Sequence, residues 1–141
     1  MRKSIIILLT VAALALPIVD ATATAATKAK AKKIVVTKRF TGSVASVDRW
    51  GSLQVTIVVR KTTTITGTKK KVTRRMTAVT VPVYPNHTDR SVFINQNALP
   101  TLKAEALKAQ SANINMVSGA TDTSNGFEQS LQSAIVKALR A

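Results

Sequence analysis

Alternating apolar and polar positions in the first half of the chain predict antiparallel β-strands. The clearest case is residues 53–61, in which Leu53, Val55, Ile57 and Val59 fall on one face. Residues 40–47 and 72–83 show similar β-branched runs next to glycine or proline, as half-buried strands do. The polar residues 62–71 predict an extended hairpin with its tip at Gly67, where neighbouring lysines oppose edge-to-edge pairing.

Beyond residue 88 the apolar spacing changes to that of helices. Asp89 is the expected N-cap of a helix over residues 90–97. Pro100 is expected in the first turn of a second helix, because proline is tolerated there. Residues 111–117 are short and extended in pattern and predict a final strand.

Apolar residues at helical spacing predict the last helix over residues 123–139. Its start could lie two residues later, because Asn125 and Glu128 have the spacing of a capping box. The element order β-β-β-α-α-β-α indicates an α+β fold, a small antiparallel β-sheet packed on one face by helices.

Residues 1–26 have the three-part organisation of a secretory signal peptide. Two basic residues precede an apolar stretch over residues 5–15, and small residues at 21–26 offer cleavage sites. The apolar stretch is shorter than the roughly 20 residues of a membrane span, which favours cleavage over an uncleaved anchor. We therefore expect an exported, extracytoplasmic protein, in the periplasm or at the cell surface.

The rest of the chain is expected to hold one folded domain. Residues 27–33 predict a basic flexible leader, because they have too little apolar content to pack. Residues 34–141 are enough for one domain with a modest core. The chain has no cysteine, so the core must fold without disulfides, and thiolate nucleophiles and cysteine-bound metals are excluded.

Positive charge is concentrated in the first half. The formal net charge is +15, and residues 28–75 contain fourteen Lys/Arg against one acid. Such a field favours an anionic partner, either a membrane surface or a cell-wall polymer. The alternative is that the lysines only keep the surface solvated. Nucleic acid is not expected, because only 4% of residues are aromatic and stacking platforms are lacking.

The sequence has few residues of the kinds that catalyse a reaction without a cofactor or bind a metal ion. His87 is the one histidine in the sequence, and a metal ion needs several such ligands close together. The few acids are scattered along the chain, so no catalytic carboxylate pair is predicted.

Residues 117–124 contain four hydroxyl side chains and one glycine directly before the last helix. The free N–H groups and the dipole at a helix N-terminus attract phosphate. Gly119 permits close approach of a ligand, Ala120 adds no bulk, and Thr123 and Ser124 add donors. The alternative is an ordinary Ser/Thr-rich helix start.

The motif Ser118-Gly119-Ala120-Thr121 resembles the attachment motif of the FMN-binding domain family, and the likeness extends over residues 89–138. The similar blocks are Ser91–Asn95, Ala98–Leu102, Ala109–Ala112, Asn113–Ser124 and Gln129–Ala134. The resemblance implies that FMN is the cofactor and that its phosphate is esterified to the Thr121 hydroxyl. It also implies that Ser118, Gly119, Ala120, Thr123, Ser124 and Asn95 contribute to the cofactor site.

The resemblance further implies two protein partners. A separate flavin transferase would move FMN from FAD onto the chain, and an unidentified redox protein would exchange electrons with it. In the family an Asp precedes the motif serine by three residues, where this chain has Asn115, so covalent and non-covalent FMN binding both stay open.

The function that we expect is that of an electron carrier or flavin module in extracytoplasmic electron transfer, rather than a complete enzyme. The alternative is a basic cell-surface module that binds anionic polymers or membrane and carries no flavin.

Overall fold

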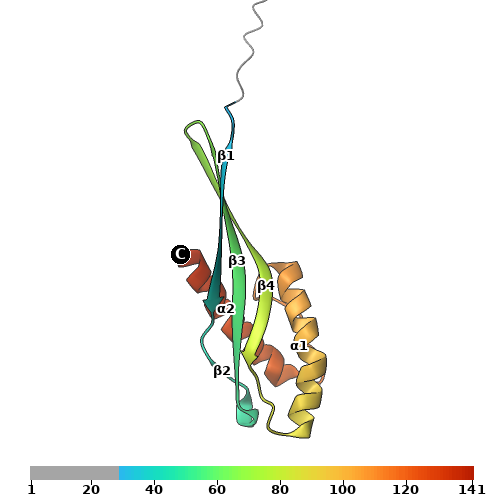
Figure 1. Cartoon of the computed structure of the whole chain (residues 1–141). Coiled ribbons are helices and arrows are strands. Elements are labelled where there is room, and N and C mark those ends of the chain that lie inside the picture. Colours follow the sequence, from blue (N-terminus) through green and yellow to red (C-terminus); the bar gives the residue numbers. More distant parts are fainter. Residues whose placement is uncertain (1–28) are drawn as a thin grey trace, which may run out of the picture.

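The computed structural model describes residues 29–141; the predicted signal peptide and the first two residues of the predicted leader lie outside them. Within the described residues the chain forms one four-stranded antiparallel sheet and two α-helices (Figure 1). The predicted α+β fold is therefore confirmed. The elements are β1 (Lys32–Thr41), β2 (Ala45–Ser46), the 3-10 turn η1 (Asp48–Trp50), β3 (Ser52–Thr66), β4 (Lys69–Val83), α1 (Asp89–Ala109) and α2 (Thr121–Arg140).

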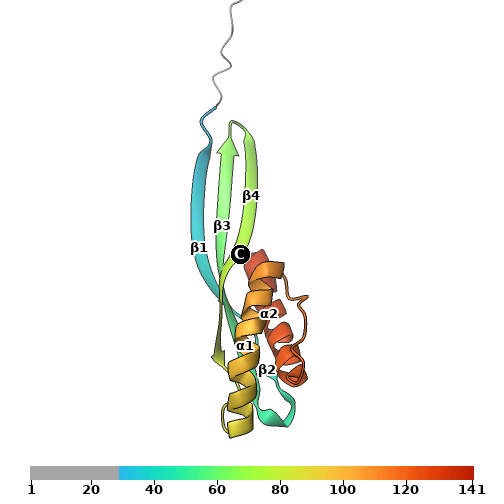
Figure 2. The same cartoon turned by 90° about the vertical axis from the view of Figure 1, so that its right-hand side faces the viewer.

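The sheet is organised around β3, which pairs antiparallel with each of the other three strands. The hairpin between β3 and β4 turns at Gly67, whose φ of 59° lies in the left-handed region. The predicted position of this tip is confirmed. Figures 1 and 2 show β1, β3 and β4 continuing well beyond the helices as a three-stranded ribbon. We call residues 32–39 and 60–75 of this ribbon the basic arm, because they include eleven Lys/Arg and no acid.

The first predicted strand, residues 40–47, is wrong in its boundaries. The structure has a long β1 that begins at Lys32 and a separate two-residue β2, with Gly42 between them. Two residues of the predicted leader, Lys32 and Lys33, therefore belong to the sheet, where they pair with the far end of β3.

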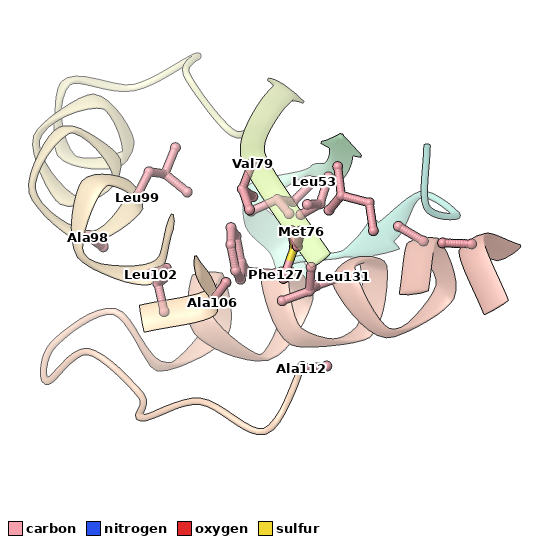
Figure 3. Packing of buried hydrophobic residues seen from close by; sticks show 14 of the residues in the cluster. Leu53, Met76, Val79, Ala98, Leu99, Leu102, Ala106, Ala112, Phe127 and Leu131 are labelled. Atoms are coloured by element: carbon pink, nitrogen blue, oxygen red, sulfur yellow. The ribbon is translucent and has the colours of Figure 1, made fainter. Parts of the chain in front are cut away.

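The hydrophobic core lies between one face of the sheet and the two helices (Figure 3). Phe127 and Leu131 of α2 are fully buried against the sheet, and Leu99 and Leu102 of α1 close the side next to β4. Each side chain of this kind contributes about 1.5–3 kcal/mol when it is fully buried. The core thus holds both helices on the same sheet.

Ser130 fixes α2 to the strands at the middle of the helix. Its hydroxyl accepts a hydrogen bond from the Val55 N–H at 2.8 Å and donates one to the Ser43 carbonyl at 2.7 Å. A Cβ at Gly42 would overlap the Ser130 carbonyl oxygen, so only glycine fits where the link from β1 to β2 crosses the helix. This close contact fixes how α2 lies on the sheet, and with it the place where the helix begins.

The two helices predicted around Pro100 are a single helix, α1. Proline removes one backbone donor and costs about 3 kcal/mol in a helix interior. The helix continues because Leu99 and Leu102 are buried beside the proline. In addition, the Asn97 side-chain amide donates to the Phe93 carbonyl at 2.7 Å in the preceding turn.

The predicted helix and strand ends also need correction. The N-cap of α1 is Thr88 rather than Asp89, and its hydroxyl accepts from the Ser91 N–H at 3.1 Å. Residues 111–117 pair with no strand and form the connection between the helices, so the predicted final strand is wrong. Helix α2 begins at Thr121, two residues before the predicted start.

The C-terminal end of α1 covers the outer edge of β4. The Gln110 side chain accepts from the Met76 N–H at 2.7 Å and donates to the Met76 carbonyl at 2.9 Å. It thus replaces the pairing that another strand would make and leaves less free edge for association. Next to the arm, by contrast, β4 has no helix beside it (Figure 2).

Candidate functional site

A cavity of about 260 Å³ lies where the turn η1 and the first turns of both helices meet. In Figures 1 and 2 these segments are at the end of the molecule opposite the hairpin tip. We call this cavity the terminal pocket. Its lining residues are Val47, Arg49, Trp50, Pro85, Arg90, Ser91, Ile94, Asn95, Gly119, Ala120, Thr121, Asp122 and Thr123.

Helix α2 begins in the terminal pocket with uncapped backbone donors. Its N-cap, Ala120, has no side chain that could accept a hydrogen bond, and the first helical bond runs from the Ser124 N–H to the Ala120 carbonyl at 2.9 Å. Among residues 29–141, nothing accepts from the N–H groups of Thr121, Asp122 and Thr123. Together with the positive end of the helix dipole, these donors can bind an anion such as phosphate.

The Thr121 hydroxyl is exposed at the terminal pocket. Thr121 is exposed, lines the pocket, and makes no side-chain hydrogen bond within the described part of the chain. Gly119 has a φ of 79°, which favours glycine, and a Cβ built there would meet nothing within 4 Å. The hydroxyl therefore lies beside open space that a large group can enter.

Thr123 and Asn95 are buried and join the pocket walls to one another. The Thr123 hydroxyl donates to the Asn95 side-chain oxygen at 2.9 Å. The Asn95 side-chain amide donates to the Pro85 carbonyl at 2.7 Å. This chain of hydrogen bonds links the start of α2, the middle of α1 and the segment after β4. The two residues thus hold the pocket in shape, and the Thr123 hydroxyl is already engaged.

Ser124 and Ser118 differ from the other predicted site residues because neither lines the terminal pocket. The buried Ser124 hydroxyl donates to the Ala120 carbonyl at 2.8 Å and accepts from the Val117 N–H at 3.1 Å. It therefore fixes the turn that carries Gly119 into the helix. Ser118 is exposed on that turn.

Eight residues that line the pocket were not predicted as site residues from the sequence, and three of them, Arg49, Trp50 and Arg90, have side chains suited to FMN. The Arg49 guanidinium lies 5.0 Å from the centroid of the Trp50 ring, a cation–π distance. Arg49 and Arg90 offer positive charge to a phosphate, and the half-buried Trp50 offers an aromatic face. The only sequence signal was the chain's single tryptophan in a tight turn next to an arginine.

Asn115, the residue that departs from the family motif, lies outside the terminal pocket. It is exposed, and its side-chain amide donates to a Glu105 carboxylate oxygen at 3.4 Å. Its influence on the site can therefore only be indirect, for example through a protein that recognises this surface.

Residues 29–141 contain neither a cluster of metal ligands nor a membrane-spanning helix. No three His, Asp or Glu side chains come together there as a metal site would require. No helix in the same residues is long and apolar enough to cross a membrane.

The pocket residues fit FMN in three respects. The free N–H groups of α2 and two arginines suit its phosphate, and Trp50 suits its aromatic ring system. The Thr121 hydroxyl stands free at the same helix end. A comparison with curated proteins found no match. The family model described as FMN-binding domain matches residues 48–136, which is more than half of the chain and includes η1 and the starts of both helices. The chain therefore belongs to the FMN-binding domain family, and FMN is its cofactor.

Proposed function

We propose that the protein is an exported electron carrier that holds FMN covalently on Thr121. One observation supports the linkage most strongly: a free, exposed Thr121 hydroxyl stands at the uncapped N-terminus of α2, inside the family motif. The neighbouring hydroxyl of Thr123 is buried and donates to Asn95, so it is a poorer candidate for the linkage.

Attachment requires a separate flavin transferase. A bond forms between the Thr121 Oγ and the phosphorus on the FMN side of FAD, and the bond from that phosphorus to AMP breaks. AMP leaves, and the hydroxyl proton passes to a base. No described side chain accepts a hydrogen bond from the Thr121 hydroxyl, so the base must come from the transferase.

The chain's own residues would bind and orient the cofactor. The N–H groups at the start of α2 and the guanidinium groups of Arg49 and Arg90 would hold the phosphate. Trp50 would pack against the ring system. Asn95 and Thr123 would keep these elements in place through their hydrogen bond.

Bound FMN supplies the redox chemistry, while the protein positions it and tunes its surroundings. The pocket volume of about 260 Å³ is below the roughly 300–1,000 Å³ typical of sites that enclose a ligand. A site of this size favours a carrier that presents its cofactor to a partner protein over an enzyme that encloses a substrate.

Export is supported by the order of basic, apolar and small residues in residues 1–26. A covalent bond suits an exported flavoprotein, because a dissociated cofactor outside the cytoplasm would be lost by dilution. We infer that electron transfer takes place on the extracytoplasmic side of the membrane.

Co-expression with a flavin transferase tests the proposal. The purified protein is expected to be yellow and heavier by the mass of FMN less water. Thr121→Ser should keep the modification, while Thr121→Ala should abolish it and leave the fold intact. A colourless wild-type protein of unmodified mass would contradict the proposal, and so would a modified Thr121→Ala variant.

A further inference from the structure

A second cavity, of about 440 Å³, lies at the base of the basic arm, next to the last turn of α2. We call it the arm groove. Its apolar floor includes Val36 of β1, Val59 of β3 and Val72 of β4. Four cationic side chains line it: Lys38, Lys61, Lys70 and Arg74. Apolar and cationic groups thus occur together in one hollow. The last turn of α2, marked C in Figures 1 and 2, lies where the arm begins, away from η1 and β2.

Strand register explains why only four of the arm's eleven cations line the groove. Directly paired residues lie on the same sheet face. Lys61 pairs with Arg74, and both line the groove, whereas Arg60 pairs with Arg75 on the opposite face. Neighbouring residues of β4 therefore carry the same charge on opposite sides of one sheet.

The surroundings of the groove leave its positive charge largely unopposed. The arm contains no acidic residue, and no Asp or Glu side chain lines the groove. Lys61 is already engaged, because it donates to the Ala141 backbone oxygen at 3.1 Å, whereas the last turn of α2 adds two further basic residues, Lys137 and Arg140. Such a hollow attracts anions and opposes a second copy of the same arm.

The apolar floor narrows the choice of anion. Val36 is 41% exposed and Val72 is 38% exposed, so the groove presents apolar surface to solvent beside its cations. A fully solvated polyanion gains nothing from such a surface. An anionic phospholipid has both a phosphate for Lys and Arg and acyl carbons for valine.

We propose that the arm groove binds the phosphate headgroup and upper acyl carbons of an anionic phospholipid, and so holds this end of the protein at a membrane. The chain enters β1 at the outer end of the same arm (Figure 2). The terminal pocket then faces away from the membrane, where a partner protein can approach it. The proposal does not depend on how FMN is attached.

Vesicle binding tests the charge requirement. The exported protein should co-sediment in 0.1 M salt with vesicles of phosphatidylcholine and phosphatidylglycerol, but not with phosphatidylcholine alone. In the groove variant, Lys70→Gln with Arg74→Gln, the affinity should fall on the order of 30-fold, since each cation near an anionic surface contributes about fivefold. The matched control, Lys71→Gln with Arg75→Gln, removes the same charge from the same strand on the other face and should lose less than about fivefold. All four residues are exposed, so folding should be unaffected.

The apolar floor has its own test. Val36→Thr with Val72→Thr keeps shape and charge and should weaken vesicle binding roughly tenfold, because valine contacts with acyl carbons are lost. Val35→Thr, on the opposite face, is the control. Binding of long-chain polyphosphate should be the same for the wild type, the Val36→Thr/Val72→Thr variant and the Val35→Thr variant. Equal losses in the groove and control variants would overturn the proposal. The absence of binding to anionic vesicles would also overturn it. A preference for polyphosphate over vesicles would overturn it too and would assign the arm to a soluble polymer.

Discussion

The hydrogen bond between Thr123 and Asn95 predicts that Thr123 contributes to the stability of the fold, whereas flavin attachment depends on Thr121. Thr123→Val removes the hydroxyl but keeps a β-branched side chain of similar shape, so helix propensity changes little. The Asn95 side-chain oxygen accepts from Thr123 at 2.9 Å, and Asn95 is only 2% exposed. The substitution therefore leaves a buried acceptor without its donor.

The expected cost follows from this burial. An unsatisfied buried polar group costs about 1–3 kcal/mol, and burying a methyl group in place of the hydroxyl returns up to about 0.8 kcal/mol. The free energy of unfolding should therefore fall by about 1–2 kcal/mol. For a domain of this size, such a loss lowers Tm by about 4–8 °C.

Urea unfolding of the flavin-free protein measures this loss as a lower midpoint with an unchanged slope. The matched control is Thr121→Val, two residues earlier on the same helix. Thr121 is exposed and its hydroxyl is unbonded in the described structure, so its unfolding free energy should change by less than about 0.5 kcal/mol. After co-expression with a transferase the outcomes should reverse: Thr123→Val keeps covalent FMN and Thr121→Val has none.

Two results would refute this reasoning. A Thr123→Val protein as stable as wild type would mean that the bond to Asn95 is not formed or not buried. Loss of covalent FMN in Thr123→Val, with retention in Thr121→Val, would move the linkage to Thr123.

Two further substitutions test other parts of the structure. Gly42→Ala places a Cβ against the Ser130 carbonyl, so overpacking should destabilise the fold by about 1–3 kcal/mol or more. Thermal unfolding measures this loss. An unchanged Tm would contradict the close contact between Gly42 and α2. Asn115→Asp restores the usual family residue and places a second carboxylate near Glu105. The flavinylated fraction, measured by intact mass, should rise while stability falls by no more than about 0.5 kcal/mol, and an unchanged fraction would show that the transferase accepts asparagine.

Local patterns were sufficient to predict β3 and the tip of its hairpin with β4. The alternation in residues 53–61 and the glycine at position 67 depend on neighbouring residues, and the structure confirms both features. The continuity of α1 through Pro100 depends instead on Leu99 and Leu102, which are buried by distant elements. Propensity rules describe the cost of the proline but not this compensation.

Contacts between segments that are distant in the sequence also explain why Arg49 and Trp50 were not predicted as site residues. Arg49 and Trp50 come from a turn some seventy residues before Thr121 in the sequence, and only the folded sheet brings them to the helix start. Residues 111–117 have the composition of a strand, but the structure offers them no partner strand. Strand formation requires such a partner, which a single segment cannot reveal.

The most direct test of the central claim is to locate the flavin on the chain. After co-expression with a flavin transferase, the protein is digested and the fluorescent peptide is fragmented in a mass spectrometer. We predict that the fragments carry FMN, less one water, on Thr121. A modified residue other than Thr121, or FMN that is released intact on denaturation, would contradict covalent attachment at the uncapped start of α2.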